Sequence, residues 1–174
     1  MSVGQKISVD EYDAWIAEGR FEPREEHHVE LIHGDLVAMS PAGPLHADIL
    51  SLIAQWSYRV TLGLDVAIRV QTPLRLAGFQ SQPEPDIAWV RAARYRDRHP
   101  QAADTYLVIE VSHSSLDFDR EVKAGLYASA GIPEYWLVDV ESRTIEVRRE
   151  PSAGGYRSLE VLGVGQTADR KSVV

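Results

Sequence analysis

The sequence contains no cysteine among its 174 residues. This absence excludes disulfide bonds, thiolate zinc sites, iron–sulfur clusters and cysteine nucleophiles. No run of residues approaches the roughly 18 apolar residues that a membrane-spanning helix needs. Residues 1–15, MSVGQKISVDEYDAW, also lack the apolar segment of a secretory signal. We therefore expect a soluble, cytoplasmic protein that does not enter the membrane.

Positive charge is scarce, with 18 lysine and arginine residues against 26 aspartate and glutamate residues and a formal net charge of −8. This balance disfavours a basic nucleic-acid coat protein and a polybasic membrane binder. It leaves room for an acidic enzyme that acts on nucleic acid, because metal ions can offset a local cluster of carboxylates. Hydrophobic residues make up 44% of the chain, which is typical of a globular protein.

The length fits one domain that spans residues 1–174. The tail from about residue 165, GQTADRKSVV, carries no strand-like apolar pattern, so its place in the fold is left open. Helical spacing predicts helices that begin after Ser8 and end at Gly19, and that span about 45–60 and 116–131. Alternating or continuous apolar runs predict strands at 66–70, 86–90, 106–112, 134–140, 143–150 and 155–163, and two short strands within 29–40.

The run from 106 to 140 reads as strand, helix, strand, which is a parallel crossover unit. The other strands follow one another as a meander, and 91–104 reads as a short helix plus a loop. The fold class predicted from these elements is α/β (α+β): two helices packed on a mixed central sheet of about five to eight strands.

The most informative residue is Glu110, because it interrupts the dense apolar run of residues 107–111. Burial of an isolated carboxylate costs several kcal/mol unless a metal ion or another cation compensates it. Asp86 opens a second apolar strand, and Lys123 lies on the helix that follows Glu110. Because such a helix folds its first turns back over the end of its strand, we expect Asp86, Glu110 and Lys123 to meet at one edge of the sheet.

Two carboxylates and one ammonium group suit a hard divalent cation such as magnesium, which prefers oxygen ligands and keeps several waters. The chemistry that such a site supports is phosphodiester hydrolysis. The metal polarises the phosphate and lowers the pKa of a bound water. The ammonium group of Lys123 orients the attacking water or stabilises the growing negative charge.

Three segments, PEPDIAWV (83–90), LVIEVSHSS (107–115) and DREVKAGLYASAGIPEYWLVD (119–139), resemble the PD-(D/E)XK nuclease superfamily. More closely, they resemble the Uma-type family of "putative restriction endonucleases". The resemblance implies a restriction endonuclease-like core and a Mg²⁺-dependent endonuclease, with Mn²⁺ as a substitute and DNA as the substrate. Asp86 matches the PD motif and Glu110 the following acidic strand. Ser112 stands where the common lysine would be, and Lys123 matches a lysine displaced to the helix.

The same resemblance assigns further roles. Glu30 matches an early glutamate that joins Asp86 and Glu110 as a metal ligand, while Asp119 and His46 match supporting positions beside the catalytic residues. From the residues alone, Glu30 could equally be a metal ligand or a surface charge, and His46 is more often a helix-start or core histidine than a catalyst. The run of residues 25–28, Glu-Glu-His-His, is interpreted as a solvated charged segment, because adjacent side chains diverge.

Structural alternatives stay open for the three central residues as well. Glu110 could pair with a buried arginine, Asp86 could cap the turn after Pro85, and Lys123 could be only the exposed i+4 partner of Asp119.

The leading hypothesis is therefore a metal-dependent endonuclease acting on DNA, and a homodimer would match the symmetry of double-strand cutting. The alternative is a nuclease-fold protein without catalytic activity that binds nucleic acid or a partner protein. The arginines at positions 91, 94, 96 and 98 form its most evident anion-facing strip. A third hypothesis is a phosphoesterase that acts on small substrates. The sequence leaves open the recognised DNA sequence, the strand state and the biological role.

Overall fold

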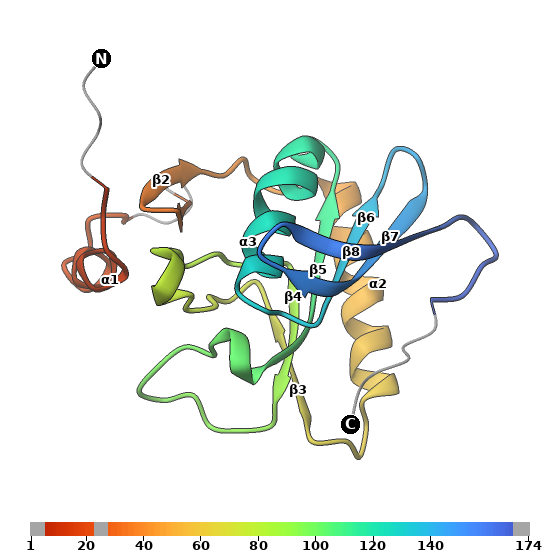
Figure 1. Ribbon diagram of the computed structural model, residues 1–174, viewed down its shortest axis with the longest axis horizontal. Coiled ribbons are helices and arrows are strands. Elements are labelled where there is room, and N and C mark those ends of the chain that lie inside the picture. Colours follow the sequence, from red (N-terminus) through yellow and green to blue (C-terminus); the bar gives the residue numbers. More distant parts are fainter. Residues whose placement is uncertain (1–5, 23–27, 169–174) are drawn as a thin grey trace.

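The computed structural model describes residues 6–22 and 28–168, which form a mixed sheet with helices on both faces and a separate hairpin (Figure 1). The helices are α1 (Val9–Ala17), α2 (Pro44–Val60), α3 (Ala124–Ser129), a π-helix η3 (Phe118–Lys123), and the short 3₁₀-helices η1 (Ala77–Phe79) and η2 (Ala102–Asp104). The strands are β1 (Val29–Ile32), β2 (Asp35–Ala38), β3 (Val66–Val70), β4 (Ile87–Arg91), β5 (Thr105–Ser112), β6 (Glu134–Asp139), β7 (Thr144–Ser152) and β8 (Gly155–Leu162).

The larger sheet has six strands in the order β3-β4-β5-β6-β7-β8, and β1 pairs with β2 in a hairpin of its own. Strands β5 and β6 are parallel, with Glu110 opposite Leu137, and all the other neighbouring pairs are antiparallel. The predicted crossover unit is therefore confirmed, and so is the mixed sheet. Because of this crossover, the carboxyl end of β5 is followed directly by η3 and α3.

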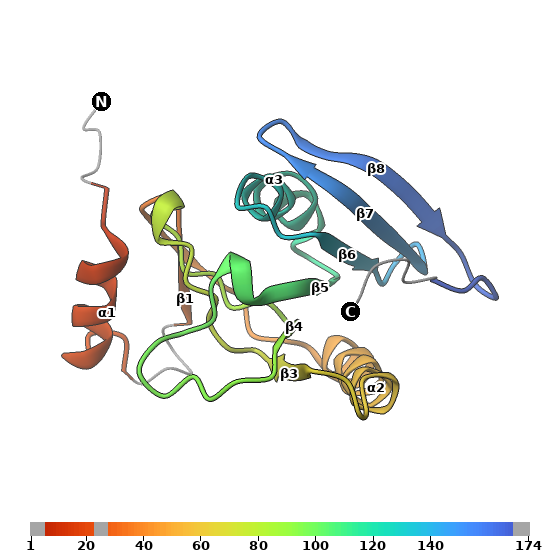
Figure 2. The same ribbon diagram turned by 60° about the horizontal axis from the view of Figure 1, so that its bottom comes forward.

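The core has two parts, one on each face of the sheet, and Figure 2 shows α2 and α3 on opposite sides. Side chains of β5 alternate between them, as the period of a strand requires. Leu107, Ile109 and Val111 pack on the α2 side, whereas Val108 packs on the α3 side. Glu110 lies two residues after Val108 in the same strand, so its side chain points to the same face of the sheet. The strand therefore turns Glu110 toward the helix that carries Lys123.

Helix α2 confirms the predicted helix at 45–60, but several of its apolar residues are exposed. Leu50 and Ser57 are the buried residues of α2, and Leu45 and Leu52 are 54% and 59% exposed. The indole ring of Trp56 lies 5.5 Å from that of Trp89, and such aromatic contacts anchor a helix on a sheet. Apolar spacing therefore predicted the helix correctly, but the face of α2 that is buried against the sheet is narrower than its apolar residues suggest.

The predicted helix at 116–131 begins as a π-helix rather than as a regular α-helix. The Ala124 N–H donates to the carbonyl of Asp119, five residues earlier, and Gly131 ends the segment with a φ of 80°. Asp117, the residue before this π-helix, makes no side-chain capping bond. The predicted helix within 91–104 is also reduced to the three residues of η2.

The N-terminal elements follow the predicted pattern closely. Ser8 and Glu11 form a reciprocal capping box at the start of α1. The turn between β1 and β2 places His33 and Gly34 at φ values of 51° and 79°, a left-handed geometry that glycine adopts without strain. Of the described helices, none is both long and apolar enough to cross a membrane. The tail is described as far as Ala168, which packs on the α2 side of the sheet, and 169–174 lie outside the described residues.

Candidate functional site

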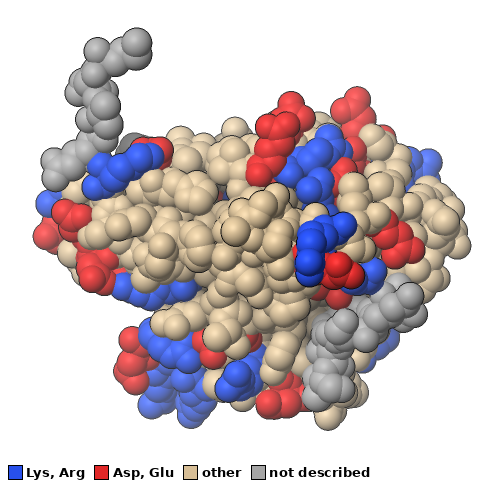
Figure 3. Space-filling view, viewed as in Figure 1, with Lys and Arg blue, Asp and Glu red and all other residues tan. Residues whose placement is uncertain are grey.

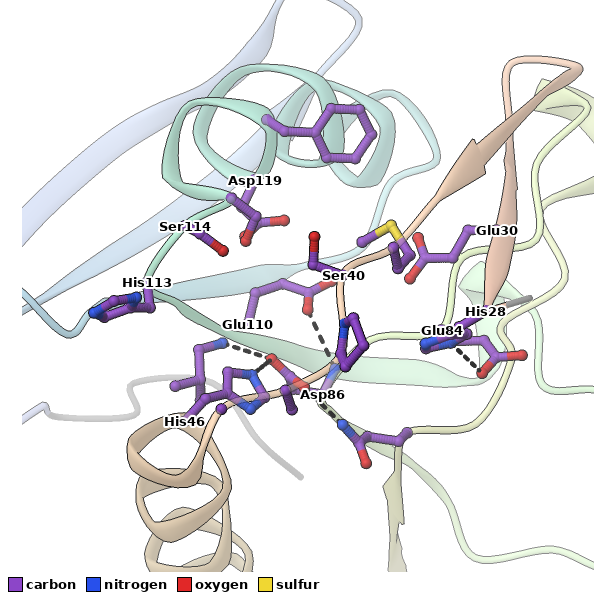
Figure 4. Close-up of a pocket in the computed structure, with 18 of the residues that line it drawn as sticks. His28, Glu30, Ser40, His46, Glu84, Asp86, Glu110, His113, Ser114 and Asp119 are labelled. Atoms are coloured by element: carbon purple, nitrogen blue, oxygen red, sulfur yellow. Dashed lines mark hydrogen bonds and ion pairs between the residues drawn. The ribbon is translucent and has the colours of Figure 1, made fainter. Parts of the chain in front are cut away.

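A cavity of about 820 Å³ opens where β4 begins and β5 ends (Figure 4). Its wall is formed by the connection between β2 and α2 and by the first turn of η3. Its charged and imidazole side chains are those of His28, Glu30, His46, Glu84, Asp86, Glu110, His113, Asp119 and Lys123. Five carboxylates and one ammonium group thus share one cavity, which leaves an excess of negative charge.

Glu110 is the centre of the polar contacts at the floor of this cavity. Its Oε1 accepts hydrogen bonds from Lys123 Nζ at 3.0 Å and from the Tyr127 hydroxyl at 2.9 Å, and its Oε2 accepts from the Asp86 N–H at 3.2 Å. Burial raises the pKa of the Glu110 carboxyl to about 8, with Lys123 opposing the shift. The cation beside Glu110 is therefore a lysine and not the buried arginine of the structural alternative.

Lys123 holds the carboxylates of the cavity together. Its Nζ also lies 3.2 Å from Glu30 Oε1 and 3.9 Å from Asp119 Oδ1, and the residue is only 2% exposed. Burial alone would lower the pKa of the Lys123 ammonium, but Glu110, Glu30 and Asp119 raise it above its ordinary value. Lys123 is therefore not the exposed partner of Asp119 alone, because it bridges three elements of the fold.

Asp86 links the start of β4 to the end of β5. Its Oδ2 accepts the Val111 N–H at 2.8 Å and contacts His46 Nε2 at 3.0 Å, and its Oδ1 accepts from Gln71 Nε2 at 3.3 Å. Figure 4 shows these contacts converging on the Asp86 carboxylate. Asp86 does more than cap a turn, because its carboxylate bonds to the backbone of the neighbouring strand.

His46 lies in the first turn of α2, two residues after the proline that begins the helix. The hydrogen bond with Asp86 raises the pKa of the His46 imidazole, although its partial burial acts in the opposite direction. Its Nδ1 is buried and has no hydrogen-bond partner among the described residues. His46 therefore orients Asp86 and keeps a second nitrogen directed away from that contact.

Glu30 is not a surface charge, since only 1% of the residue is exposed. Burial raises the pKa of its carboxyl, and Lys123 opposes the shift. The Glu30 Oε2 atom has no hydrogen-bond partner within the described part of the chain. One oxygen of Glu30 thus binds the lysine, and the other remains available to a ligand.

Asp119 reaches the cavity from η3 and is supported by two serines. Its Oδ2 accepts from the Ser115 hydroxyl, which lies 3.2 Å from Ser112 Oγ. Burial raises the pKa of the Asp119 carboxyl. Ser112, at the position of the superfamily's lysine, therefore belongs to a hydrogen-bonded chain that ends at Asp119 and not at Glu110.

Sequence reasoning missed two other contributors. His28 Nε2 lies 3.3 Å from Glu84 Oε2 in the cavity, although His28 was assigned to a solvated run whose residues 25–27 lie outside the described residues. Tyr127 binds Glu110 from α3. The spacing carried a signal for Glu84, which precedes Asp86 by the period of a strand, and for Tyr127, which follows Lys123 by one helical turn, but none for His28.

The donors fit a magnesium ion by their chemistry, because carboxylate oxygens are the ligands that this ion prefers. Glu30 Oε2 and Asp119 Oδ1 are also buried oxygens that accept no hydrogen bond from the described residues. However, no three histidine, aspartate or glutamate side chains in the described ranges are already arranged around a common point. The ammonium group of Lys123 lies between Glu30 and Glu110, so metal binding would require some of these side chains to reorient.

The arginine strip lies at the other end of β4, in the loop that connects it to β5. Figure 3 shows positive charge gathered at the lower left, where Figure 1 places this loop. Arg98 pairs with Asp104, whereas Arg94 and Arg96 are exposed and form no ion pair with described residues. Arg91 is also exposed and forms no ion pair with described residues, so the strip offers three cations to an anionic partner.

Comparisons with known proteins agree with this fold. A family model described as "Uma2: Putative restriction endonuclease" matches residues 9–174. The chain is also similar to a solved structure from Anabaena variabilis ATCC 29413, described as a "putative nuclease belonging to DUF820". That likeness has a TM-score of 0.70 at 17% sequence identity and covers 95% of this chain and 89% of the other, which establishes the shared fold. No curated protein matches the sequence.

Proposed function

The chain belongs to the Uma2 family, described as "Putative restriction endonuclease", and we propose that it is a metal-dependent endonuclease that hydrolyses phosphodiester bonds in DNA. The observation that carries this proposal is the buried contact between Glu110 and Lys123 beside Asp86. Such a pair is seldom more stable than apolar residues of similar size, so chemistry explains its presence better than stability does.

The excess of carboxylates in the cavity supports Mg²⁺, or Mn²⁺ in its place, as the cofactor. Five acids face one lysine there, and a phosphate would be repelled unless a divalent cation offset their charge. Asp86, Glu110 and Glu30 would hold the ion. When bound, the metal would polarise the scissile phosphate and lower the pKa of a coordinated water.

The remaining roles follow from the contacts of each side chain. Lys123 directs an ammonium group to the place where negative charge grows during hydrolysis. His46 holds the Asp86 carboxylate, and Asp119 lies 3.9 Å from the lysine. Tyr127 donates to the same Glu110 oxygen as Lys123 and so restricts its rotation. His46, Asp119 and Tyr127 would thus act by positioning groups that touch the phosphate or the metal.

A second candidate is a nuclease-fold protein that binds nucleic acid without cutting it. It is favoured by the arrangement of the described acids, which do not surround a common point, and by the ion pairs that occupy Glu30 and Glu110 with Lys123. The exposed Arg94 and Arg96 would then carry the binding.

The test compares wild type with the Glu110→Gln and Lys123→Met variants on plasmid and single-stranded DNA, with magnesium, manganese or a chelator. Glu121→Gln is the matched control, because Glu121 is an exposed acid on the same π-helix. We expect metal-dependent cleavage that falls by about 100-fold or more in the two site variants, which is the usual loss for an electrostatic catalytic group. Equal cleavage by all four proteins, or cleavage by none, would overturn the proposal.

A further inference from the structure

The catalytic groups of the proposed nuclease lie at the floor of a cavity and not on an open surface. Glu30, Lys123 and Glu110 are 1%, 2% and 3% exposed, and Asp86 is 9% exposed. We propose, on the basis of the proposed function, that the segment this site accepts is an unpaired, single-stranded stretch of DNA and not an intact duplex.

The wall that shields these groups is a continuous piece of chain. All residues from Val37 to His46 line the cavity, and Figure 4 shows this connection crossing it, with Ser40 beside Glu110. The connection is held at both ends, because the Met39 N–H donates to the His28 carbonyl and the Ala47 N–H donates to the Gly43 carbonyl. Duplex DNA would have to displace this wall before a phosphate reached the floor.

Proline makes the wall stiff as well as anchored. Pro41 and Pro44 each fix one backbone dihedral angle, and each restricts the residue before it to an extended geometry. Pro44 is also the first residue of α2, so the far end of the wall continues into a helix of 17 residues. A connection with this composition has little backbone freedom to open.

The size of the cavity agrees with this reading. Its volume of about 820 Å³ lies in the range of pockets that enclose a drug-sized molecule. A duplex is far wider, since its major groove alone measures about 12 Å across. Enzymes that modify bases meet a similar problem of access, and they act on single-stranded DNA or extrude a nucleotide from the helix.

The lining is polar at the floor and apolar at the wall and rim. The apolar part includes Val37, Met39, Pro41, Pro44, Leu45 and Phe118. An unpaired strand matches both halves, because its phosphates are charged and its base faces are free to pack against apolar side chains. In a duplex those faces are covered by neighbouring bases. Leu45, which is 54% exposed on this rim, is the clearest candidate for a contact with a base.

The experiment uses three end-labelled substrates of one sequence: a single strand, a full duplex, and a duplex with a central unpaired bubble. With magnesium or manganese, we expect the single strand and the bubble to be cut at least tenfold faster than the duplex, with cuts confined to the bubble. Equal rates on all three would overturn the inference while leaving the proposed nuclease activity intact.

A rim variant adds a readout that does not depend on the carboxylates. Leu45→Ser should raise the KM for single-stranded DNA by about threefold or more, the scale of a few lost apolar contacts. Leu52→Ser is the matched control, because Leu52 is an equally exposed leucine of α2 outside the cavity lining. An unchanged KM in Leu45→Ser would contradict the assigned contact.

The outcomes separate the two proposals. If no substrate is cut, the proposed function fails, and fluorescence anisotropy with the same oligonucleotides then decides the inference. Tighter binding of the single strand than of the duplex, weakened by Leu45→Ser, would support it. Equal binding of both forms would overturn it.

Discussion

Lys123 Nζ lies 3.0 Å from Glu110 Oε1, and both side chains are almost completely shielded from solvent. The two residues are 13 positions apart, one at the end of a central strand and the other on the helix that follows. Because β5 and β6 are parallel, the chain must cross over the sheet between them, and that crossover sets the lysine over the glutamate. The crossover from β5 to β6 therefore explains both the parallel pairing of these strands and the contact between Lys123 and Glu110.

Removal of the lysine charge should destabilise the protein. Lys123→Met leaves Glu110 and Glu30 buried without their cation, and we expect the free energy of unfolding to fall by about 3–5 kcal/mol in urea titrations at pH 7. The double variant Lys123→Met/Glu110→Gln removes both charges, so it should be more stable than the sum of the two single changes implies. Strictly additive losses would show that the two groups are not coupled.

Loss of the Tyr127 hydroxyl should affect turnover more than folding. Tyr127→Phe removes one donor to Glu110 Oε1 and leaves the ring in the core, so the expected cost in unfolding free energy is about 1–2 kcal/mol. If Tyr127 positions Glu110, kcat should fall while KM for DNA stays unchanged. Tyr58→Phe serves as the control, because Tyr58 is 55% exposed on α2. A loss in stability with no change in kcat would reduce Tyr127 to a structural role.

Magnesium should raise the thermal stability of the protein, because a bound cation would offset the excess charge of the cavity. At millimolar magnesium and constant ionic strength, we expect Tm to increase by about 2–4 °C, which corresponds to about 1 kcal/mol for a domain of this size. Asp86→Asn and Glu110→Gln should lose this increase, whereas Glu121→Gln should keep it. An unchanged Tm in the wild type would favour the binding protein without catalysis.

The extent to which the sequence predicted this arrangement differs from residue to residue. Glu110 was recognisable because a carboxylate in a continuous apolar strand has no ordinary explanation, and the crossover placed Lys123 near it. The π-helical start of the following helix was not predictable from apolar spacing, since its hydrogen bonds skip one extra residue without changing which residues are apolar. Tyr127 and His28 were missed for a related reason: each joins the cavity through a tertiary contact, and neither interrupts a local pattern.

The loop between β4 and β5 should lose stability in acid. Asp104 accepts hydrogen bonds from Arg98 and from the Gln101 N–H, and the bond from Arg98 is the largest cause that lowers the pKa of this carboxyl. Its contribution is therefore present above the ordinary aspartate value of 3.8 and disappears as the pH falls through the lower folded value. The difference in unfolding free energy between wild type and Asp104→Asn should shrink below about pH 4. Asp97→Asn, a change at an exposed acid of the same loop, is the control variant.

The exposed arginines of this loop should contribute to DNA affinity without contributing to catalysis. Arg94 and Arg96 form no ion pair with described residues, so both are available to phosphates at a distance from the acidic cavity. Each phosphate contact releases counterions, and the double variant Arg94→Gln/Arg96→Gln should therefore bind single-stranded DNA more weakly, with a salt dependence shallower by about 0.7 per lost contact. Arg20→Gln is a suitable control, because Arg20 already pairs with Glu18. If the double variant kept the wild-type affinity and salt slope, the strip would not be a DNA contact, and the negatively charged protein would need another surface to attract its substrate.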